Sequence, residues 1–211
     1  MEKEFERQVD TSHYNPSQYD HQHRWLSYFY QIALVRSTKA RRVLEIGPGN
    51  GTVSEALRKM GIQVTTVDID PGLHPDIVAS VTELPVENGA FDLVSACEVL
   101  EHIPFKEFKK SLAELARVSS SYVLISLPDA RRTLLHLVFK IPLFNEIALR
   151  LRVMKGESHI FDGQHYWEIG KRGFPPSYIR AVIKDCGLDI IEDHAYHDAP
   201  FYHFFLLKKR L

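Results

Sequence analysis

The segment Val43-Leu44-Glu45-Ile46-Gly47-Pro48-Gly49-Asn50-Gly51 carries the strongest structural signal in this sequence. Its first four residues have the apolar pattern of a short buried strand, and residues 52–60 place apolar side chains on one face of a helix. The glycines between them let the backbone turn sharply and approach a ligand closely, because they have no Cβ. The N-terminus of the helix offers unpaired N–H groups to an anionic group. The segment therefore predicts a ligand-binding turn at the end of a strand in an α/β domain.

Strands and helices alternate on both sides of this turn. Further strands are expected at residues 62–69, 76–81, 91–96 and 122–127. Such alternation favours a parallel sheet with right-handed crossovers. After a helix at 175–186, strands are expected at 188–196 and 201–207. These two strands lie too close in sequence for a helical crossover, so they should pair antiparallel.

Two further segments flank this core. Residues 1–38 are expected to form an N-terminal helical cap, whose helix at 17–37 carries one apolar stripe: Trp25, Tyr28, Phe29, Ile32 and Ala33. Tyr28 and Tyr30 either cover the ligand or pack in the core. Residues 130–174 show no convincing strand and are expected to form a helical lid. The sequence thus predicts a single domain over 1–211, with a Rossmann-like, seven-stranded, mostly parallel sheet, a C-terminal antiparallel hairpin and a helical lid insertion.

The glycine pattern argues against a dinucleotide as the ligand. The dinucleotide fingerprint G-x-G-x-x-G requires glycine where this chain has Thr52. Glu45 would repel a pyrophosphate but suits a ligand with a cationic amine or sulfonium. S-adenosylmethionine (SAM) has both groups. Asp68, at the end of the second strand, is placed to bind ribose hydroxyls, and Asp70 could serve equally well.

From about residue 43 to residue 128 the chain resembles the class I SAM-dependent methyltransferases, close to the group of ubiquinone- and menaquinone-biosynthesis-like enzymes. The segment at 43–51 is similar to the family's first motif, and Val67-Asp68-Ile69-Asp70 is similar to its ribose-binding strand end. Glu83-Leu84-Pro85-Val86 and Phe91-Asp92-Leu93-Val94 resemble the stretch that leads into the fourth strand. Cys97-Glu98-Val99-Leu100-Glu101-His102 is similar to the fourth-strand motif.

The resemblance implies SAM as the cofactor, with its methionine end near the glycines and its ribose at Asp68. The cofactor-binding residues that it implies are Glu45, Gly47, Pro48, Gly49, Gly51, Asp68, Ile69, Val81 and Glu98. Many relatives have an acid after the third strand that binds the adenine amino group. Ser80 stands at that place here, so adenine contacts are expected from the backbone around Val81.

Methyl transfer from a sulfonium can be catalysed mostly by alignment and by exclusion of water. A general base is needed only when the acceptor arrives protonated. His102, just past the fourth strand, is the candidate base; alternatively it closes the pocket or caps the following helix. His165 and Tyr166 in the insertion are candidates for acceptor contact, and the alternative for them is a packed aromatic corner.

No metal site is expected. His194 and His197 fall on opposite faces of a strand, and no acid at ligand spacing completes a set with His203. Residues 131–155 hold six cations against one acid, Glu146, with apolar residues between them. This segment either contacts a membrane surface or a lipid-like acceptor, or covers the pocket with its apolar face while its charges stay solvated.

The bulk composition narrows the function. A net charge of −1 over 211 residues gives none of the basic field typical of a dedicated nucleic-acid binder.

The segment after the fourth strand argues against methylation of base amino groups. Relatives that methylate such groups often carry Asn/Asp-Pro-Pro-Tyr/Phe where this chain has Cys97-Glu98-Val99-Leu100. With two widely separated cysteines, no signal-peptide pattern and no apolar stretch of about 20 residues, a cytoplasmic protein is expected.

The sequence therefore predicts methyl transfer from SAM to an oxygen, carbon or nitrogen atom of a small-molecule acceptor, with lipid or glycan precursors as one class. Two alternatives remain open at this stage. One is a nucleic-acid or protein methyltransferase, and the other is a SAM-binding fold that has lost catalysis and acts as a partner subunit. The oligomeric state is not predicted.

Overall fold

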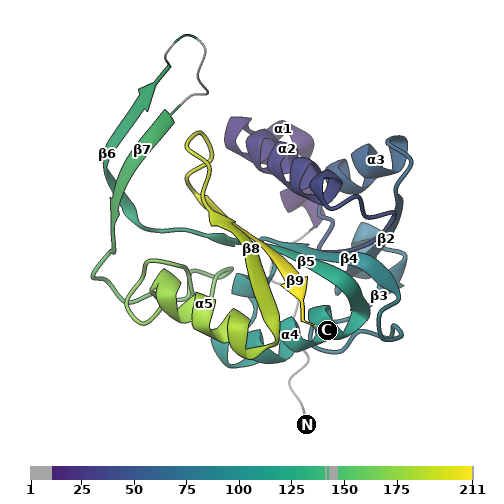
Figure 1. Ribbon diagram of the computed structural model, residues 1–211. Helices are drawn as coiled ribbons and strands as arrows, with labels where there is room; N and C mark the ends of the chain where they lie inside the picture. Colours follow the sequence, from purple (N-terminus) through teal and green to yellow (C-terminus); the bar gives the residue numbers. More distant parts are fainter. Residues whose placement is uncertain (1–10, 141, 143–146, 211) are drawn as a thin grey trace.

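A seven-stranded sheet with helices on both faces forms the body of the protein (Figure 1). The computed structural model describes residues 11–140, 142 and 147–210. The strand order is β3-β2-β1-β4-β5-β9-β8, and β9 runs antiparallel to both of its neighbours while the other pairs are parallel. The strands of this sheet are β1 Arg42–Ile46, β2 Gln63–Asp68, β3 Ile77–Val78, β4 Phe91–Cys97, β5 Ser119–Pro128, β8 Leu188–His194 and β9 Tyr202–Lys209. The predicted Rossmann-like sheet with its C-terminal hairpin is confirmed.

The helices cover the two faces of the sheet in separate layers. In Figure 1, α2 and α3 lie on one face and α4 and α5 on the other. The helical segments are η1 Thr11–Tyr14, α1 Pro16–Tyr19, α2 Gln22–Ser37, α3 Thr52–Lys59, η2 Pro71–Leu73, η3 Leu100–His102, α4 Phe105–Val118 and α5 Pro176–Asp185. Successive strand residues alternate between the two cores, because side chains point to opposite faces: Val43 packs in one core and Leu44 in the other.

The buried face of α2 differs from the predicted apolar stripe. Trp25 and Phe29 are 54% and 61% exposed, whereas the residues that pack on the sheet are Ser27, Tyr28, Gln31, Leu34 and Val35. Gln31 donates a hydrogen bond from Nε2 to Oγ of Ser27 at 3.1 Å. This hydrogen bond lets two polar side chains lie inside the core. A prediction based only on apolar residues therefore chose the wrong face of the helix.

The two tyrosines of α2 that were candidates for covering the ligand have other neighbours. Tyr28 donates from its hydroxyl to Asp20 Oδ1 at 2.9 Å. Tyr30 lies flat against Tyr196 and donates to Asp198 Oδ1 at 2.6 Å, so it joins α2 to the segment between β8 and β9. Of the two interpretations, packing therefore fits both residues.

The insertion at 130–174 was predicted to be helical, and this prediction was wrong. Within the described part of 130–174 there is no helix, and β6 Arg132–Phe139 pairs antiparallel with β7 Ile147–Val153. The two strands form an arm that projects from the body of the molecule (Figure 1). The sequence of β7, Ile-Ala-Leu-Arg-Leu-Arg-Val, alternates with the period of a strand. Glu146, the acid of this segment, lies outside the described residues.

A buried carboxylate fastens the base of the arm. The side chain of Asp129 is fully buried, and it accepts hydrogen bonds from Arg131, Arg152 and His203 at 2.6, 2.7 and 3.1 Å. Burial opposes the charged form, but these donors and the two arginine charges outweigh it and hold the pKa of Asp129 well below its usual range. Arg150 donates to the carbonyl of Tyr196 at 3.0 Å. Half of the six cations at 131–155 are therefore bound to the body of the protein.

Candidate active site

A cavity of about 510 Å³ lies at the carboxyl ends of β1, β2 and β4. This volume is in the range of small-molecule sites. The chain leaves β1 toward β2 on one side, while β4 lies on the other, so the cavity sits at the switch point of the sheet. Its wall comes from the glycine turn, the ends of these strands, the segment before α2 and the loop around residue 164.

The glycine turn brings backbone to the floor of the cavity. Gly47 has φ +69, and a Cβ placed on it would lie 2.5 Å from Cγ2 of Val99. Gly49 has φ +56, and its Cβ would meet the ring of Tyr14 at 3.3 Å. Both positions combine a left-handed conformation with a close neighbour, and glycine meets both requirements. Both residues line the cavity.

Other residues of this turn lie behind the cavity surface. Glu45, Pro48 and Gly51 are not among the described residues that line it. Glu45 is 6% exposed, and burial raises its pKa to about 8. Gly51 donates from its backbone N–H to the carbonyl of Pro48 at 2.9 Å and precedes the first residue of α3. Direct cofactor contact by these three residues stays a prediction.

The ends of β2 and β3 supply one side of the cavity, which Asp68, Ile69, Ser80 and Val81 all line. Asp68 accepts a hydrogen bond from the backbone N–H of Asp70 at 2.8 Å, and burial raises its pKa. Asp70 accepts from the N–H of Gly72 at 2.9 Å and so caps η2. Each of the two carboxylates thus accepts one backbone N–H, and both line the cavity, so the assignment of Asp68 as the ribose-binding acid stays a prediction.

Glu98 enters the cavity from the end of β4. Its φ of +56 is unusual for a residue with a side chain. Oε1 accepts a hydrogen bond from the Ser126 hydroxyl at 2.8 Å, which holds the carboxylate in place. Burial raises the pKa of Glu98, and the nearby charge of Arg24 partly offsets this effect.

An acid and a histidine from η3 and a histidine from the insertion also line the cavity. Glu101 is fully buried, and burial together with Glu98 raises its pKa well above the usual range. His102 donates from Nδ1 to the carbonyl of Gln164 at 3.0 Å, and burial lowers its pKa to about 4. His102 is therefore neutral near pH 7 and able to accept a proton.

The insertion contributes the second histidine. Nδ1 of His165 lies 2.9 Å from Oε1 of Glu168, and this partner raises the pKa of His165 although burial opposes its charge. The rings of His102 and His165 meet edge to face with centroids 5.1 Å apart. Metal-ligating atoms of Glu101, His102 and His165 lie within 4.8 Å of one another, as do those of Asp162, His165 and Glu168.

Tyr166 acts here through its backbone. Its N–H donates to the carbonyl of Glu101 at 2.8 Å, which ties the insertion to η3. The ring is 39% exposed, packs on Phe161 at 4.5 Å and is not among the described residues that line the cavity. Contact between this ring and an acceptor stays a prediction.

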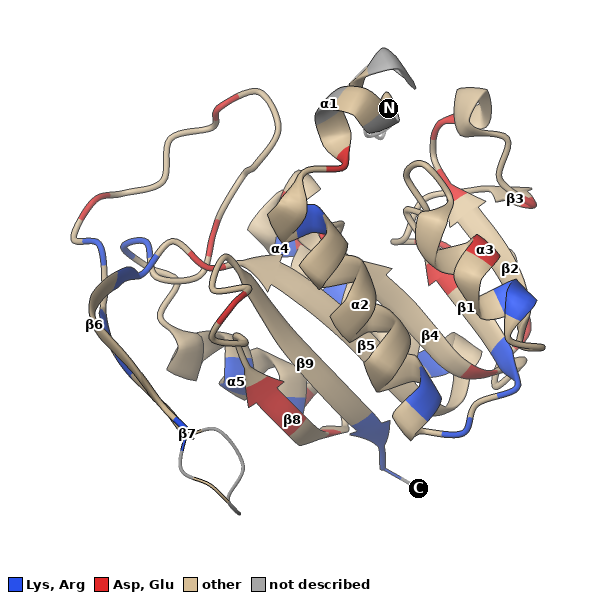
Figure 2. Ribbon diagram, turned by 90° about the horizontal axis from the view of Figure 1, so that it is seen from above, with Lys and Arg blue, Asp and Glu red and all other residues tan. Residues whose placement is uncertain are grey.

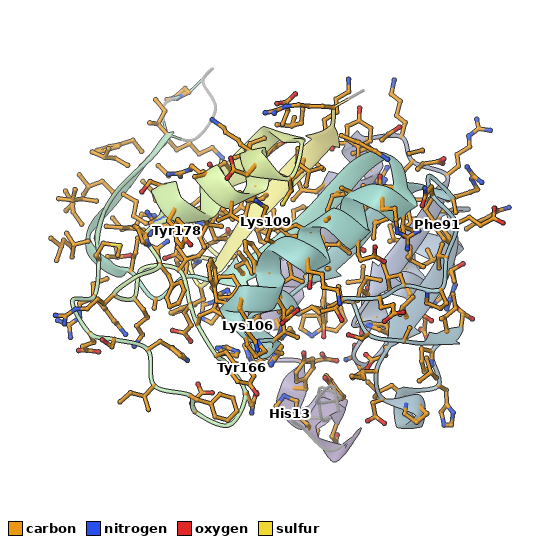
Figure 3. The ribbon with its side chains drawn as sticks, turned by 90° about the horizontal axis from the view of Figure 1, so that it is seen from below. His13, Phe91, Lys106, Lys109, Tyr166 and Tyr178 are labelled. Carbon is orange, nitrogen blue, oxygen red and sulfur yellow. The ribbon has the colours of Figure 1, made fainter. Side chains whose placement is uncertain are left out.

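The N-terminal segment supplies cavity residues that the sequence interpretation missed. These residues are His13, Tyr14, Tyr19, His21, His23 and Arg24. The Arg24 guanidinium lies 4.4 Å from the ring centroid of Tyr19, and its Nε has no hydrogen-bond partner among the described residues. His13 and Tyr166 lie at the same end of the molecule in Figure 3. The sequence feature that could have indicated these cavity residues is the high frequency of His, Tyr and Arg at 13–24.

Comparison with known proteins agrees with this geometry. Residues 44–121 match the methyltransferase domain family. The ubiquinone biosynthesis O-methyltransferases of Xanthomonas oryzae pv. oryzae (strain PXO99A) and Xanthomonas campestris pv. campestris (strain B100) are each 38% identical, over 30% of this chain and 33% of the relative. The match thus covers about a third of the length of these curated relatives.

Solved structures show the same fold over most of the chain. The 1,6-didemethyltoxoflavin-N1-methyltransferase of Burkholderia thailandensis, with bound S-adenosylhomocysteine, has a TM-score of 0.62 at 14% identity, covering 95% of this chain and 87% of that chain. The SAM-bound magnesium protoporphyrin IX methyltransferase of Synechocystis PCC 6803 has a TM-score of 0.57 at 17% identity, covering 89% and 80%. The domain match at residues 44–121, the strand order and the cavity at the switch point are thus all similar to those of SAM-dependent methyltransferases.

Proposed function

We propose that this chain transfers a methyl group from SAM to an oxygen, carbon or nitrogen atom of a small-molecule acceptor. The observation that carries the proposal is that one cavity joins the glycine turn, Asp68 and the group formed by Glu101, His102 and His165. A cofactor bound along the turn therefore shares a single cavity with titratable side chains. The names of the relatives and structural neighbours, which are methyltransferases of small molecules, support this class of acceptor.

In the proposed complex, SAM lies across the strand ends. The methionine end lies at Gly47 and Gly49, the ribose hydroxyls donate to Asp68, and the adenine lies near Val81. Glu98 places a carboxylate on the same wall, where it favours the cationic amine and sulfonium. Since no side chain occupies the glycine positions, the cofactor can approach the backbone closely.

Catalysis then rests on alignment and on exclusion of water. The acceptor atom attacks the methyl carbon in line with the C–S bond, and the electron pair of that bond stays on sulfur, which becomes neutral. Arg24 and the residues before it cover the cavity on one side, and the loop that holds His165 covers it on another. If the acceptor is a hydroxyl, His102 is the group that takes its proton.

The projecting arm supports contact with a lipid-like acceptor or a membrane surface. Cross-strand pairs 135/151, 137/149 and 139/147 place six exposed apolar residues on one face: Leu135, Leu137, Phe139, Ile147, Leu149 and Leu151. The opposite face carries Arg150 and Arg152, which bind the body of the protein. Figure 2 shows further Lys and Arg positions along the arm. No helix in the described ranges has the length and apolar character needed to cross a bilayer.

Incubation with methyl-labelled SAM and fractionated cell extract tests the proposed reaction. Label is expected in the small-molecule or lipid fraction, with a loss of at least tenfold in the Asp68→Ala variant. Label confined to nucleic acid or protein would replace the proposed acceptor class. No transfer to any fraction by a protein that binds SAM would favour the non-catalytic partner subunit.

A further inference from the structure

Glu101 is a buried acid whose surroundings do not satisfy it. Its side chain is 0% exposed, and neither oxygen has a hydrogen-bond partner among the described residues. Nε2 of His102 lies 3.9 Å from Oε1, beyond hydrogen-bond distance. Burial of a carboxyl group without hydrogen bonds is unfavourable, so the presence of Glu101 requires an explanation. An ion that binds both oxygens, or one of them, supplies such a partner.

The two histidines next to Glu101 are oriented as metal ligands usually are. In each ring Nδ1 faces an acceptor, the Gln164 carbonyl for His102 and the Glu168 carboxylate for His165. Metal-binding histidines almost always donate one ring N–H to a carbonyl or carboxylate, because this fixes the ring and makes the other nitrogen a better ligand. Nε2 of each ring is then the nitrogen that would bind the ion.

The spacing of the three groups fits a small dication. Their ligand atoms lie within 4.8 Å of one another. A tetrahedral ion with ligands at about 2.0–2.1 Å holds them about 3.3 Å apart, so closure requires movements of about 1.5 Å at most. His165 lies on a loop, and both histidine side chains are partly exposed, which permits this movement.

The charges of the side chains that line the cavity also favour a bound cation. Its described lining contains four carboxylates, Asp68, Asp70, Glu98 and Glu101, against the single guanidinium of Arg24. SAM brings positive charge to the glycine turn, but Glu101 lies at the acceptor end. The second possible set shares His165 but relies on Asp162, whose Oδ1 already accepts two backbone N–H bonds at 2.9 and 2.8 Å. The set with Glu101 is therefore favoured.

We propose that Glu101, His102 and His165 bind a divalent transition-metal ion such as Zn²⁺ at the acceptor end of the cavity. Two imidazoles and a carboxylate suit first-row divalent ions. Three protein ligands leave a coordination position open toward the cavity, where an oxygen of the acceptor can bind. Metal binding can be measured without SAM or acceptor. While the ion is bound, Nε2 of His102 is a ligand and cannot take the proton of a hydroxyl acceptor, so the proposed role of His102 as base belongs to the metal-free protein.

Tag-free protein, stripped with chelator, is titrated with Zn²⁺ by calorimetry and with Co²⁺ by visible absorption. One ion per chain is expected, with micromolar or tighter affinity and Co²⁺ bands typical of a four- or five-coordinate site. Glu101→Gln and His165→Ala are each expected to weaken binding at least tenfold. The matched control is His194→Ala, because His194 and Glu192 form a similar pair at 3.8 Å on β8, outside the cavity.

Three results would overturn the proposal: no binding by wild-type protein at 100 µM ion, equal binding by both cavity variants, or loss of binding in the control. Circular dichroism establishes that each variant is folded, and Glu101→Gln keeps the shape of the side chain. S-adenosylhomocysteine binding is measured on the same preparations. A protein that binds this ligand and no metal contradicts only the metal site, and the reverse result contradicts only the cofactor assignment.

Discussion

Alanine at Gly47 is expected to destabilise the protein by about 2–5 kcal/mol. The backbone at this position has φ +69, which costs a residue with a Cβ about 1–2 kcal/mol. The new Cβ would also lie 2.5 Å from Cγ2 of Val99, and relief of such overpacking costs about 1–3 kcal/mol more. For a domain of this size, the melting temperature should fall by about 4–20 °C.

Gly61→Ala separates the two contributions. Gly61 has φ +83, but a Cβ there would meet nothing within 4 Å, so only the conformational cost of about 1–2 kcal/mol applies. Val99→Ala removes the methyl group that the Gly47→Ala side chain would strike. The double variant should therefore be more stable than the sum of the single variants predicts, by about 1–3 kcal/mol. Urea unfolding gives the free energy of unfolding of the wild type, the three single variants and the double variant. Equal effects at Gly47 and Gly61, or strict additivity with Val99→Ala, would refute the clash.

Three further predictions concern the acid network, the core and the arm. Hydrogen bonds and charges hold the pKa of Asp129 and of Asp193 below the usual range, so their stabilisation is complete above about pH 4 and is lost as the pH falls further. The melting temperature of wild-type protein should therefore drop more steeply below pH 4 than that of Asp193→Asn, and parallel curves would contradict this. Trp167 is fully buried, and Trp167→Ala should cost about 3–5 kcal/mol in urea unfolding; a cost below about 1 kcal/mol would contradict its place in the core. Co-sedimentation with anionic lipid vesicles should be reduced at least fivefold by Leu137→Ser combined with Leu149→Ser, and undiminished binding would rule out the arm as the contact.

The fold was predictable where a local pattern had one interpretation. The glycine turn at 43–51 and the strands around it could be predicted from the apolar pattern of the strands and from the glycines of the turn. Side chains of β1 indeed alternate between the two cores. The arm was missed because the Leu and Arg alternation of β7 was read as an amphipathic segment within a supposed helical lid. The buried face of α2 was missed because Ser27 and Gln31 satisfy each other inside the core.

Only those site residues that lie next to a recognisable strand could be predicted from the sequence. Gly47, Asp68 and Glu98 follow directly from strand ends, and the structure places all three at the cavity. By contrast, His102 and the loop at Gln164 are 62 residues apart. Their contact depends on the backbone bond from Tyr166 to Glu101, which no pattern in the sequence indicates. Arg24 was missed because no pattern in the sequence indicates that the first turn of α2 faces the cavity.

Calorimetric titration with S-adenosylhomocysteine, with NAD as the comparison ligand, examines the cofactor assignment itself. Wild-type protein is expected to bind S-adenosylhomocysteine with micromolar affinity and not to bind NAD. Asp68→Ala should weaken this binding at least tenfold, about 1.4 kcal/mol, because the ribose hydroxyls lose their acceptor. Folded wild-type protein that does not bind S-adenosylhomocysteine would contradict the assignment, and the glycine turn would then have only a structural role.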